Sequence, residues 1–543
     1  MKIPVYLKVF FLSFFCTALF STAFLCAQNN QEIYPVGSDI YYALTALYLE
    51  QGLAPPSSSR PFSGNEMRKA LDRIDERRLS SAGQKTYRYV KSQLEGRVLY
   101  GEKEGLAVNG SLEGNLEGYL HTNIDYTGWE YGYKERLPLL ELPLEMWALD
   151  WFYANMVLTL KKDPFLVTED PDNRSNFITD FAVVDVHFPY RAFLSAGGNH
   201  WNLRFGRDLY NWGNGYTGNL LLSDTLDYHD VLGFTTYWDN FKFSTLFLSL
   251  ENWEEGNIRE MDDVYKGFLG HRMEFRFLRR ITISLFEGMM IGGKYSELRH
   301  LNPFMIYHNW MLNDRYSNIA FTMEANINPY RWINIYGQFL LDTVTSAFEK
   351  KEYPGSDKIP QANGYLFGAE SKIPLGQGYL GLGIEFVHTD PWVYLMEGQP
   401  DYIVERRFLS NYLKSITLIS KPLGYGYAPD ANVFSLRAGY RVFGFFNLGA
   451  EARIIDKGEI TADTPYRSDQ EAAEMKTPSG VPQRKIVSHF HGGLNPVFLP
   501  WKFLAQMITF RTNLYWIHIL NFKNVKGEIL DDVQWTFSLS VKL

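Results

Sequence analysis

Cysteine is nearly absent from this chain. Its 543 residues contain two cysteines, Cys16 and Cys26, and none after position 26. A chain cut after Ala27 therefore has neither a disulfide scaffold nor a cysteine-ligated metal site. The same part of the chain also lacks an apolar run of about 18 residues, the length that a transmembrane helix needs.

Catalytic and nucleotide-binding motifs are missing as well. The chain contains no G-x-S-x-G, H-E-x-x-H or P-loop pattern. Gly213, Gly215 and Gly218 spell G-x-G-x-x-G, but a Leu-rich segment follows where a dinucleotide site needs a helix. His489 and His491 share one face of a strand pattern without a third ligand nearby. We therefore predict no cofactor, no metal site and no enzymatic activity.

Concentrated charge of one sign is also lacking. The formal net charge is -8, and no basic stripe is present, which argues against nucleic acid as a partner. Aromatic residues, in contrast, make up 16% of the chain, while the mean hydropathy is only -0.22. This combination is typical of a membrane β-barrel, in which lipid-facing residues alternate with polar lumen residues and aromatic rings gather at the interfaces.

The N-terminus has the pattern of a secretory signal peptide. Lys2 and Lys8 precede an apolar run over residues 9–24, and a cut after Ala27 gives a signal peptide of residues 1–27. The alternative is a lipoprotein signal with Cys26 as the lipidated residue, but Leu25 is bulkier than the residue usually found before such a cysteine. An exported chain without a transmembrane helix belongs to the periplasm, the cell surface or an outer-membrane barrel.

Residues 28–100 have a helical pattern that the later chain lacks. Three helices are expected, from Ser38 to Glu50, from Ser63 to about Ile74, and from about Ser80 to Leu94. Ser63 and Glu66 form a capping-box pattern at the start of the second. Because such short helices give only a marginal core, we predict a periplasmic segment that packs on the larger domain as a cap or plug. A module that binds the cell wall or a periplasmic partner is the alternative.

From residue 101 to 543 the hydrophobic period changes to two. One face is apolar and the other polar in segments 109–125, 319–327, 446–454 and 535–543. Charged residues such as Glu117, Glu324 and Glu451 lie on the polar face, which suits a wet barrel lumen rather than a sandwich core. Long hydrophilic connections alternate with short turns. We predict a transmembrane antiparallel β-barrel of about 16–18 strands, closed by a last strand that reaches Leu543.

The stretch 199–224 combines an alternating strand with a glycine-rich corner. Arg204 and Gly206 are expected to face the lumen, and Leu203 and Phe205 the lipid. The pair Asn214-Gly215 predicts a hairpin turn, followed by a return strand over residues 220–222. Arg207 and Asp208 are expected to fix this corner by hydrogen bonding rather than to bind a ligand.

Aromatic and polar side chains suitable for sugar binding are numerous in the predicted loops, which contain Trp310 and Tyr402 among others. Sugars stack on aromatic rings, and their hydroxyls bind Asp, Asn, Arg and Glu. The candidates for polysaccharide binding, or for a place in the lumen, are Arg204, Arg207, Asp208, Trp212, Trp253, Trp392 and Tyr394. The strand acids Asp342, Glu385 and Glu451 are interpreted as solvated lumen charges paired with Arg437, Arg441 or Arg453 rather than as a catalytic pair.

Several short motifs follow one another in a fixed order: Phe205-Gly206-Arg207, Trp212-Gly213-Asn214-Gly215, residues 218–223, Asn302-Pro303, residues 336–342, residues 388–394 and residues 424–431. Taken in this order, they resemble the capsule assembly protein Wzi family. The helical segment over residues 38–74 is also similar. The resemblance implies an outer-membrane β-barrel with a periplasmic helical part and lectin-like binding of capsular polysaccharide at the cell surface.

The main functional hypothesis is therefore an outer-membrane barrel that binds an extracellular polysaccharide and aids its assembly or attachment, without catalysis. Its expected partners are that polysaccharide and outer-membrane lipid. The polar lumen positions equally allow a porin or transporter, which is the second hypothesis. An outer-membrane hydrolase is the third, and it needs clustered acids or a Ser/His pair at one loop end of the barrel.

Overall fold

The computed structural model describes residues 29–95, 100–101, 105–169, 173–251, 265–311, 316–343, 358–396, 399–495 and 507–543. The predicted signal peptide, residues 1–27, and Trp253 lie outside the described residues. No helix in the described ranges is long and apolar enough to cross a membrane.

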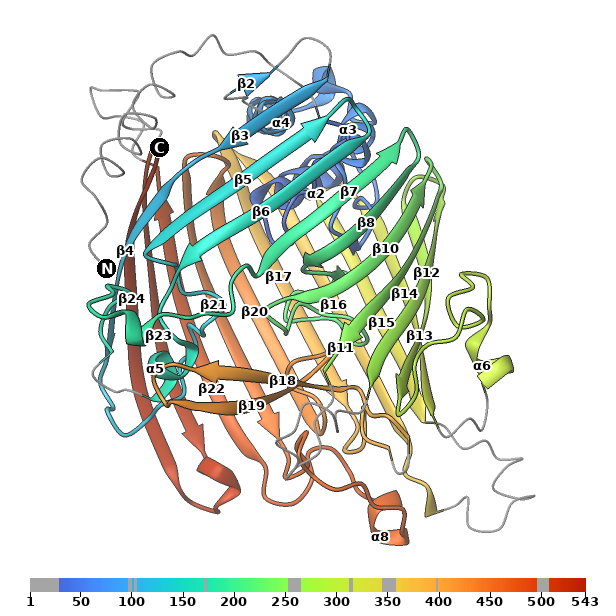
Figure 1. Ribbon diagram of the computed structural model, residues 1–543, viewed down its shortest axis with the longest axis vertical. Coiled ribbons are helices and arrows are strands. Elements are labelled where there is room, and N and C mark those ends of the chain that lie inside the picture. The colour runs from blue at the N-terminus through green and yellow to red at the C-terminus, as the bar shows by residue number, and fades with distance from the viewer. Residues whose placement is uncertain are drawn as a thin grey trace, which may run out of the picture.

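Most of the described chain is a single antiparallel sheet that curls into a barrel (Figure 1). Its strands are β2 (Tyr100–Gly101), β3 (Leu106–Gly110), β4 (Glu113–His121), β5 (Leu140–Ala148), β6 (Phe152–Leu160), β7 (Arg191–Gly198), β8 (Trp201–Asp208), β10 (His229–Tyr237), β11 (Phe241–Leu250), β12 (Lys266–Phe277), β13 (Ile281–Gly292), β14 (Ser317–Tyr330), β15 (Ile333–Thr343), β16 (Ala362–Leu375), β17 (Gly378–Thr389), β20 (Ala431–Val442), β21 (Phe446–Lys457), β22 (Gln483–Leu494), β23 (Ile508–Leu520) and β24 (Ile529–Lys542). Two small sheets lie outside this ring: β1 (Ser59–Arg60) pairs with β9 (Asn211–Trp212), and β18 (Ile403–Ser410) with β19 (Ser415–Pro422).

The barrel closes without a free edge in the part of the chain that the structure describes. β3 and β4 lie end to end along β5 and serve as one strand, and β2 adds two residues beside β3. β24 pairs with β4, and β17 with β20, which gives a closed ring of 18 strands. Closure satisfies the backbone hydrogen bonds that lipid cannot. The predicted fold class, with 16 to 18 strands, is confirmed.

Alternation along the strands separates a lipid face from a lumen face, as predicted. On β4, Leu116 and Leu120 are exposed on the outside, whereas Asn115 and Glu117 are buried inside. The same division holds on the other strands, where the exposed outer residues include Leu203, Phe205, Met323, Ile335, Phe367, Leu436, Leu448, Phe490, Trp516, Trp535 and Phe537. An apolar outer face of this kind requires lipid around it.

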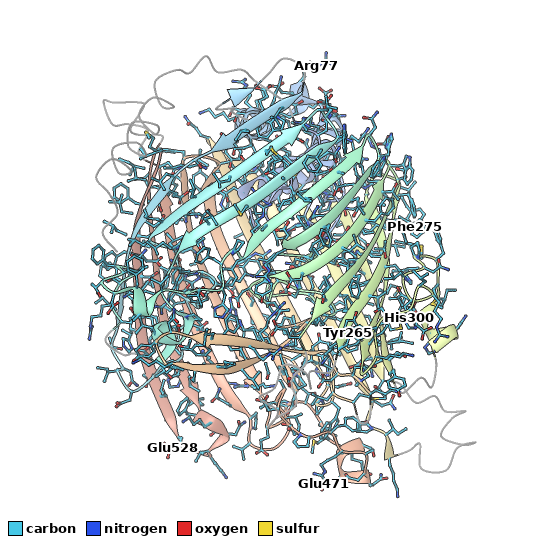
Figure 2. The ribbon with its side chains drawn as sticks, viewed as in Figure 1. Arg77, Tyr265, Phe275, His300, Glu471 and Glu528 are labelled. Atoms are coloured by element: carbon cyan, nitrogen blue, oxygen red, sulfur yellow. The ribbon has the colours of Figure 1, made fainter. Side chains whose placement is uncertain are left out.

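The N-terminal helices occupy the end of the barrel where the turns between strands are short (Figure 1). They are α2 (Asp39–Glu50), α3 (Gly64–Asp72) and α4 (Ser81–Leu94), with the 3-10 turn η1 (Glu76–Arg78) between the last two. Figure 2 labels Arg77 at this end and Glu471 and Glu528 at the opposite end. Short turns are typical of the periplasmic side of an outer-membrane barrel. The helices close the barrel at this end, and their periplasmic location stays a prediction.

The predicted helix caps are partly correct. The Ser63 side chain accepts a hydrogen bond from the Glu66 amide at 3.3 Å, as the capping box requires. The Glu66 carboxylate does not complete the box, because it binds the Nζ atom of Lys242 in β11 at 2.6 Å. Ser38 occupies the N-cap of α2, but its side chain makes no capping hydrogen bond. Docking on the barrel wall thus takes precedence over local capping.

Polar contacts fasten the helical segment to the wall. Glu50, at the end of α2, is buried; its carboxylate accepts hydrogen bonds from the Ser80 amide at 2.5 Å and from the Tyr379 hydroxyl of β17. The Trp332 amide donates to the Leu49 carbonyl at 2.8 Å. The helices therefore pack on the barrel and cover polar groups of its strands.

Glu32 makes the docking of this segment pH-dependent. Burial, together with repulsion from Glu145, raises the pKa of Glu32 from 4.5 to about 7. The folded state therefore binds this proton more tightly than the unfolded state, and its stability falls as pH rises from about 4.5 to 7. We expect the N-terminal segment to be about 1 to 2 kcal/mol less stable at pH 8 than at pH 5, after allowance for the partial exposure of the side chain. Amide hydrogen exchange of residues 29–95 measures this. Glu32→Gln should abolish the pH dependence, and an unchanged pH dependence in that variant would contradict the assignment.

Long connections leave the opposite, extracellular end, and one of them, residues 293–311, folds back along the outer wall of the barrel. They contain the short helices α5 (Pro164–Glu169), α6 (Tyr307–Met311) and α8 (Gln470–Ala473) and the 3-10 turns η2 (Phe181–Val183) and η5 (Phe522–Asn524). The β18–β19 hairpin crosses the front of the barrel below the ends of β6, β7 and β8 (Figure 1). Asp163 binds the Ser410 hydroxyl and the Asn411 amide, at 3.0 and 2.9 Å, and so holds the tip of the hairpin.

Candidate functional site

The stretch 199–224 does not form the predicted hairpin. After β8 the chain enters the barrel as a loop of residues 209–228, which we call the plug loop, and β10 begins only at His229. Within it, β9 pairs with β1 of the N-terminal segment. Residues 220–222 are not a return strand, because their three leucines are fully buried among inward-facing apolar side chains such as Phe268, Phe286 and Leu366. The lumen is therefore filled from both sides.

Two glycines shape the plug loop, but neither belongs to the predicted turn. Gly213 has a φ of 142° and Gly218 a φ of 136°, whereas Asn214 and Gly215 do not adopt positive φ. A Cβ atom on Gly213 would meet the side chains of Asn219 and Gln338. The conformation and the close approach both require glycine here. The prediction of a hairpin turn at Asn214-Gly215 is therefore wrong.

Glu324 and Arg272 hold the plug loop to one side of the lumen. Glu324 accepts hydrogen bonds from the Asn214 amide at 3.1 Å and from the Ser58 hydroxyl at 2.5 Å, so it joins the plug loop to the N-terminal segment. Arg272 lies 2.8 Å from Glu324 and 3.2 Å from Glu274. All three charged side chains are buried. A buried acid stays ionised when a paired base and several donors compensate its lost hydration.

Glu385 holds the tip of the plug loop. Its carboxylate accepts hydrogen bonds from the Tyr216 amide at 2.6 Å, the Thr217 amide at 2.8 Å and the Thr217 hydroxyl at 2.6 Å. The Tyr336 hydroxyl donates a fourth, at 2.8 Å. Glu385 is 1% exposed, so the prediction of a solvated lumen charge is wrong for this residue. Its partners are backbone and hydroxyl donors, because the plug loop brings them into the lumen.

The other predicted lumen acids differ in their partners. Glu451 lies 2.7 Å from Arg453, the expected type of pair, and also accepts a hydrogen bond from the Tyr216 hydroxyl at 2.9 Å. Asp342 instead accepts the Tyr394 amide at 2.6 Å. Asp342 thus anchors an extracellular loop rather than pairing with an arginine.

Among the candidate site residues, Arg204 and Asp208 face the lumen and Arg207 faces outward. Arg204 is buried, with its guanidinium 3.6 Å from Asp208. Asp208 also lies 3.0 Å from Arg191 of β7. Arg207 binds Asp230 at 2.8 Å, and its guanidinium stacks 3.8 Å from the ring centre of Tyr228. These contacts agree with a structural role at the end of β8, and their part in ligand binding stays a prediction.

The candidate aromatic residues that the structure describes are buried. Trp212 packs edge-on against Phe286, with ring centres 5.0 Å apart. Trp392 donates its indole N–H to the Ala472 carbonyl at 3.1 Å. The Tyr394 hydroxyl donates to the Leu220 carbonyl, so it fastens the plug loop to the extracellular loop 390–402. None of these three rings is exposed for stacking in this conformation. Their role as sugar-binding residues remains a prediction.

A polar cavity of about 290 Å³ lies where three extracellular segments meet. Its lining comes from the loop after β4, from the plug loop and from β19, and consists of Gly132, Tyr133, Lys134, Glu135, Thr217, Ser223, Asp224, Thr225 and Lys421. Lys134 binds Asp224 at 3.0 Å, and Lys421 lies 3.7 Å from Asp227. The cavity thus offers both charge signs, hydroxyls and one aromatic ring.

The charged groups behind this cavity are set by burial and hydrogen bonding. Burial lowers the pKa of Lys161 to about 8, and its Nζ atom lies 4.0 Å from the ring centre of Tyr133. Burial tends to raise the pKa of Asp185, but hydrogen bonds from His187, Tyr133 and Tyr190 outweigh it and hold that pKa below its usual range. Asp185 therefore stays ionised and orients the Tyr133 ring. Sequence reasoning missed this cavity, because its residues are dispersed over three loops and share no motif.

No group of three His, Cys, Asp or Glu side chains among the described residues is placed to hold a metal ion. The rings of His489 and His491 lie 5.0 Å apart, and His489 stacks on Tyr515 with ring centres 4.1 Å apart. This pair is part of the lumen wall.

A closed 18-stranded barrel with an apolar outer face and a filled lumen defines an outer-membrane β-barrel protein. No protein-family model and no curated protein matches the chain. Among solved structures, the chain is similar to Wzi of Escherichia coli, an outer-membrane protein involved in group 1 capsule assembly and described as a carbohydrate-binding β-barrel. The TM-score is 0.58 at 13% identity, over 95% of this chain and 99% of that one. The resemblance to the Wzi family is thereby confirmed at the level of the fold.

Two further solved structures show weaker likeness. OccD3 (OpdP) of Pseudomonas aeruginosa has a TM-score of 0.40 at 9% identity and covers 80% of this chain and 91% of its own. OccAB4 of Acinetobacter baumannii has a TM-score of 0.38 at 10% identity and covers 81% and 98%. At these scores the likeness carries no argument about function.

Proposed function

We propose that this chain binds an extracellular polysaccharide, such as capsular polysaccharide, at the extracellular end of its barrel and aids its assembly or attachment, without catalysis. The polar cavity between the plug loop, the loop after β4 and β19 is the observation that carries this proposal. It faces a filled lumen, so bound material is retained rather than conducted. The carbohydrate binding described for Wzi agrees with it.

The chemistry of the cavity suits a sugar chain. Tyr133 supplies a ring for stacking. The Thr217 and Thr225 hydroxyls donate to Glu385 and to the Pro422 carbonyl, and their oxygens can still accept hydrogen bonds from sugar hydroxyls. Lys134 and Lys421 can bind a carboxylate or a hydroxyl oxygen. A further partner in the periplasm or cell wall, reached through the N-terminal helices, stays part of the proposal.

Replacing both cavity lysines provides the direct test. In Lys134→Ala/Lys421→Ala, affinity for the native surface polysaccharide should fall about tenfold to a hundredfold, because each lost charge-assisted hydrogen bond is worth about 1.5 to 3 kcal/mol before compensation by water. Binding of purified polysaccharide to the protein in nanodiscs measures this. Lys526→Ala, on an exposed extracellular turn, is the matched control and should bind like the wild type. Equal affinity of all three proteins would remove the cavity from the proposal.

A second experiment tests the cellular role. A deletion strain should retain less polysaccharide on its surface, and the wild-type gene but not the double lysine variant should restore it. Unchanged surface polysaccharide in the deletion strain would count against the proposed function.

A further inference from the structure

We infer that residues 293–311, here called the outer arm, form the contact through which this barrel pairs with a second copy of the chain. The outer arm follows β13, and α6 lies at its end. In Figure 1, α6 stands outside the barrel beside the wall of β12, β13 and β14. Figure 2 labels His300 on the same outer side. This inference does not depend on the proposed function.

The wall beneath the outer arm carries an acid and a histidine on its outward face. Arg272 and Glu274 of β12 point into the lumen, so His271 between them points outward. Its cross-strand neighbour on β13 is Glu287, and the His271 Nε2 atom lies 3.1 Å from the Glu287 carboxylate. Such a pair is costly in contact with acyl chains.

The outer arm covers this pair. The backbone amides of Tyr307 and His308 donate to the two carboxylate oxygens of Glu287, at 3.0 and 2.9 Å. The Tyr307 ring lies 4.7 Å from the His271 ring, centre to centre. Met305 and Tyr307 pack with the outward-facing residues Leu269, Met289 and Ile291. The arm is therefore a fixed part of the wall.

The covered pair lies at the depth of the hydrocarbon layer. His271 is six residues from Phe277 at the periplasmic end of β12, which is about 20 Å along the strand. With the usual barrel tilt this corresponds to about 15 Å of height, near the middle of an apolar band about 25 Å tall. Phe304 of the arm reaches further down and stacks on Phe243 of β11, with ring centres 5.8 Å apart.

The outer surface of the arm cannot face lipid alone. Its most exposed apolar side chains are Leu298 (87%), Phe304 (83%) and Tyr295 (80%), with Ile306 and Leu301 beside them. Between them lie exposed charged residues, since Arg299 binds Glu297 at 2.8 Å while both side chains are half exposed. Hydrocarbon accepts the apolar groups but not irregular backbone and charge, which occur at this depth only where protein covers them.

A second copy of this chain fits the chemistry of the arm. Glu297 and Arg299 place both charge signs within three residues, so two arms related by a twofold axis can exchange the ion pair, Glu297 on one arm with Arg299 on the other. The exposed apolar residues on either side then cover one another. Most soluble oligomers use such symmetric contacts, in which the same surface of each subunit meets its copy. Two barrels side by side in a membrane can form a closed dimer in the same way.

Cysteine cross-linking in outer-membrane vesicles tests the inference, since no residue after position 26 is a cysteine. Leu298→Cys and Phe304→Cys should each give a disulfide-linked dimer under oxidising conditions. Leu448→Cys, at a lipid-facing position of β21 that is 57% exposed, is the matched control and should stay monomeric. Absence of a dimer from both arm variants, or a cross-link to a protein of another size, would overturn the inference.

A second measurement separates pairing from lipid contact. In native-lipid nanodiscs the wild type should be a dimer by mass, and Leu298→Asp/Phe304→Asp should reduce the dimer fraction at least tenfold while the heat-modifiable gel shift of a folded barrel is kept. A fluorophore at position 298 should be shielded from brominated lipid in the wild-type background. A monomeric wild type, or strong quenching by brominated lipid, would show that lipid covers the arm and would overturn the inference.

Discussion

Arg272→Met should destabilise the folded barrel by about 3 to 5 kcal/mol, more than any other single substitution proposed for this chain. Arg272 is 2% exposed. Its guanidinium lies 2.8 Å from the Glu324 carboxylate and 3.2 Å from the Glu274 carboxylate, and it donates a hydrogen bond to the Ser58 hydroxyl at 2.5 Å. Removing it leaves two buried carboxylates without their cation. Because Glu324 also holds the Asn214 amide, the plug loop and the N-terminal segment should loosen together. Urea unfolding followed by tryptophan fluorescence measures the loss.

Arg484→Met is the matched control for this prediction. Arg484 binds Asp456 at 2.6 Å, but its side chain is 52% exposed, so water replaces the lost partner. The cost should be below about 1 kcal/mol. If both substitutions cost the same, the buried network around Glu324 would not be what holds the plug loop and the N-terminal segment in place.

The alternation of strand residues predicted the barrel well, because lipid and lumen impose opposite requirements on successive side chains. Leu116, Leu120, Asn115 and Glu117 lie as the pattern requires. The number of strands followed from the length of the chain and of a membrane-spanning strand. These are local properties, and a single sequence contains them.

The interior of the lumen could not be predicted in the same way. Leu220, Leu221 and Leu222 form an apolar run that a strand would also contain, and only the inward-facing Phe268 and Phe286 explain why a loop buries them. Glu385 looked like a solvated charge because its partners, the amides of residues 216 and 217, are about 170 residues away in the chain. Contacts between distant segments leave no periodic signal.

Truncating the plug loop should abolish polysaccharide binding yet leave the barrel closed to ions. Replacing residues 214–221 by a short Gly-Ser linker removes Thr217 from the cavity and the backbone donors that Glu385 binds. The N-terminal helices still fill the periplasmic end, where Glu50, Glu66 and Lys242 fasten them to the wall. Because the two obstructions lie in series, removing one should leave the single-channel conductance in planar bilayers close to the low value expected for the wild type.

Removing both obstructions should open the pore. A variant that lacks residues 214–221 and also residues 29–95 should conduct far more than either single truncation, provided that the heat-modifiable gel shift shows a folded barrel. Its current should stay below that of an empty barrel, because Trp392, Tyr402 and Tyr425 still pack against inward-facing strand residues. A matched linker replacement in the extracellular turn 523–527, which touches neither obstruction, should change neither binding nor conductance. Large currents through the wild type, or through the plug-loop truncation alone, would favour a porin or transporter over a binding protein. Loss of polysaccharide binding without any current in the plug-loop truncation would favour the binding protein over the pore. A pore does not need the plug loop for sugar contact, whereas the proposed binding site does.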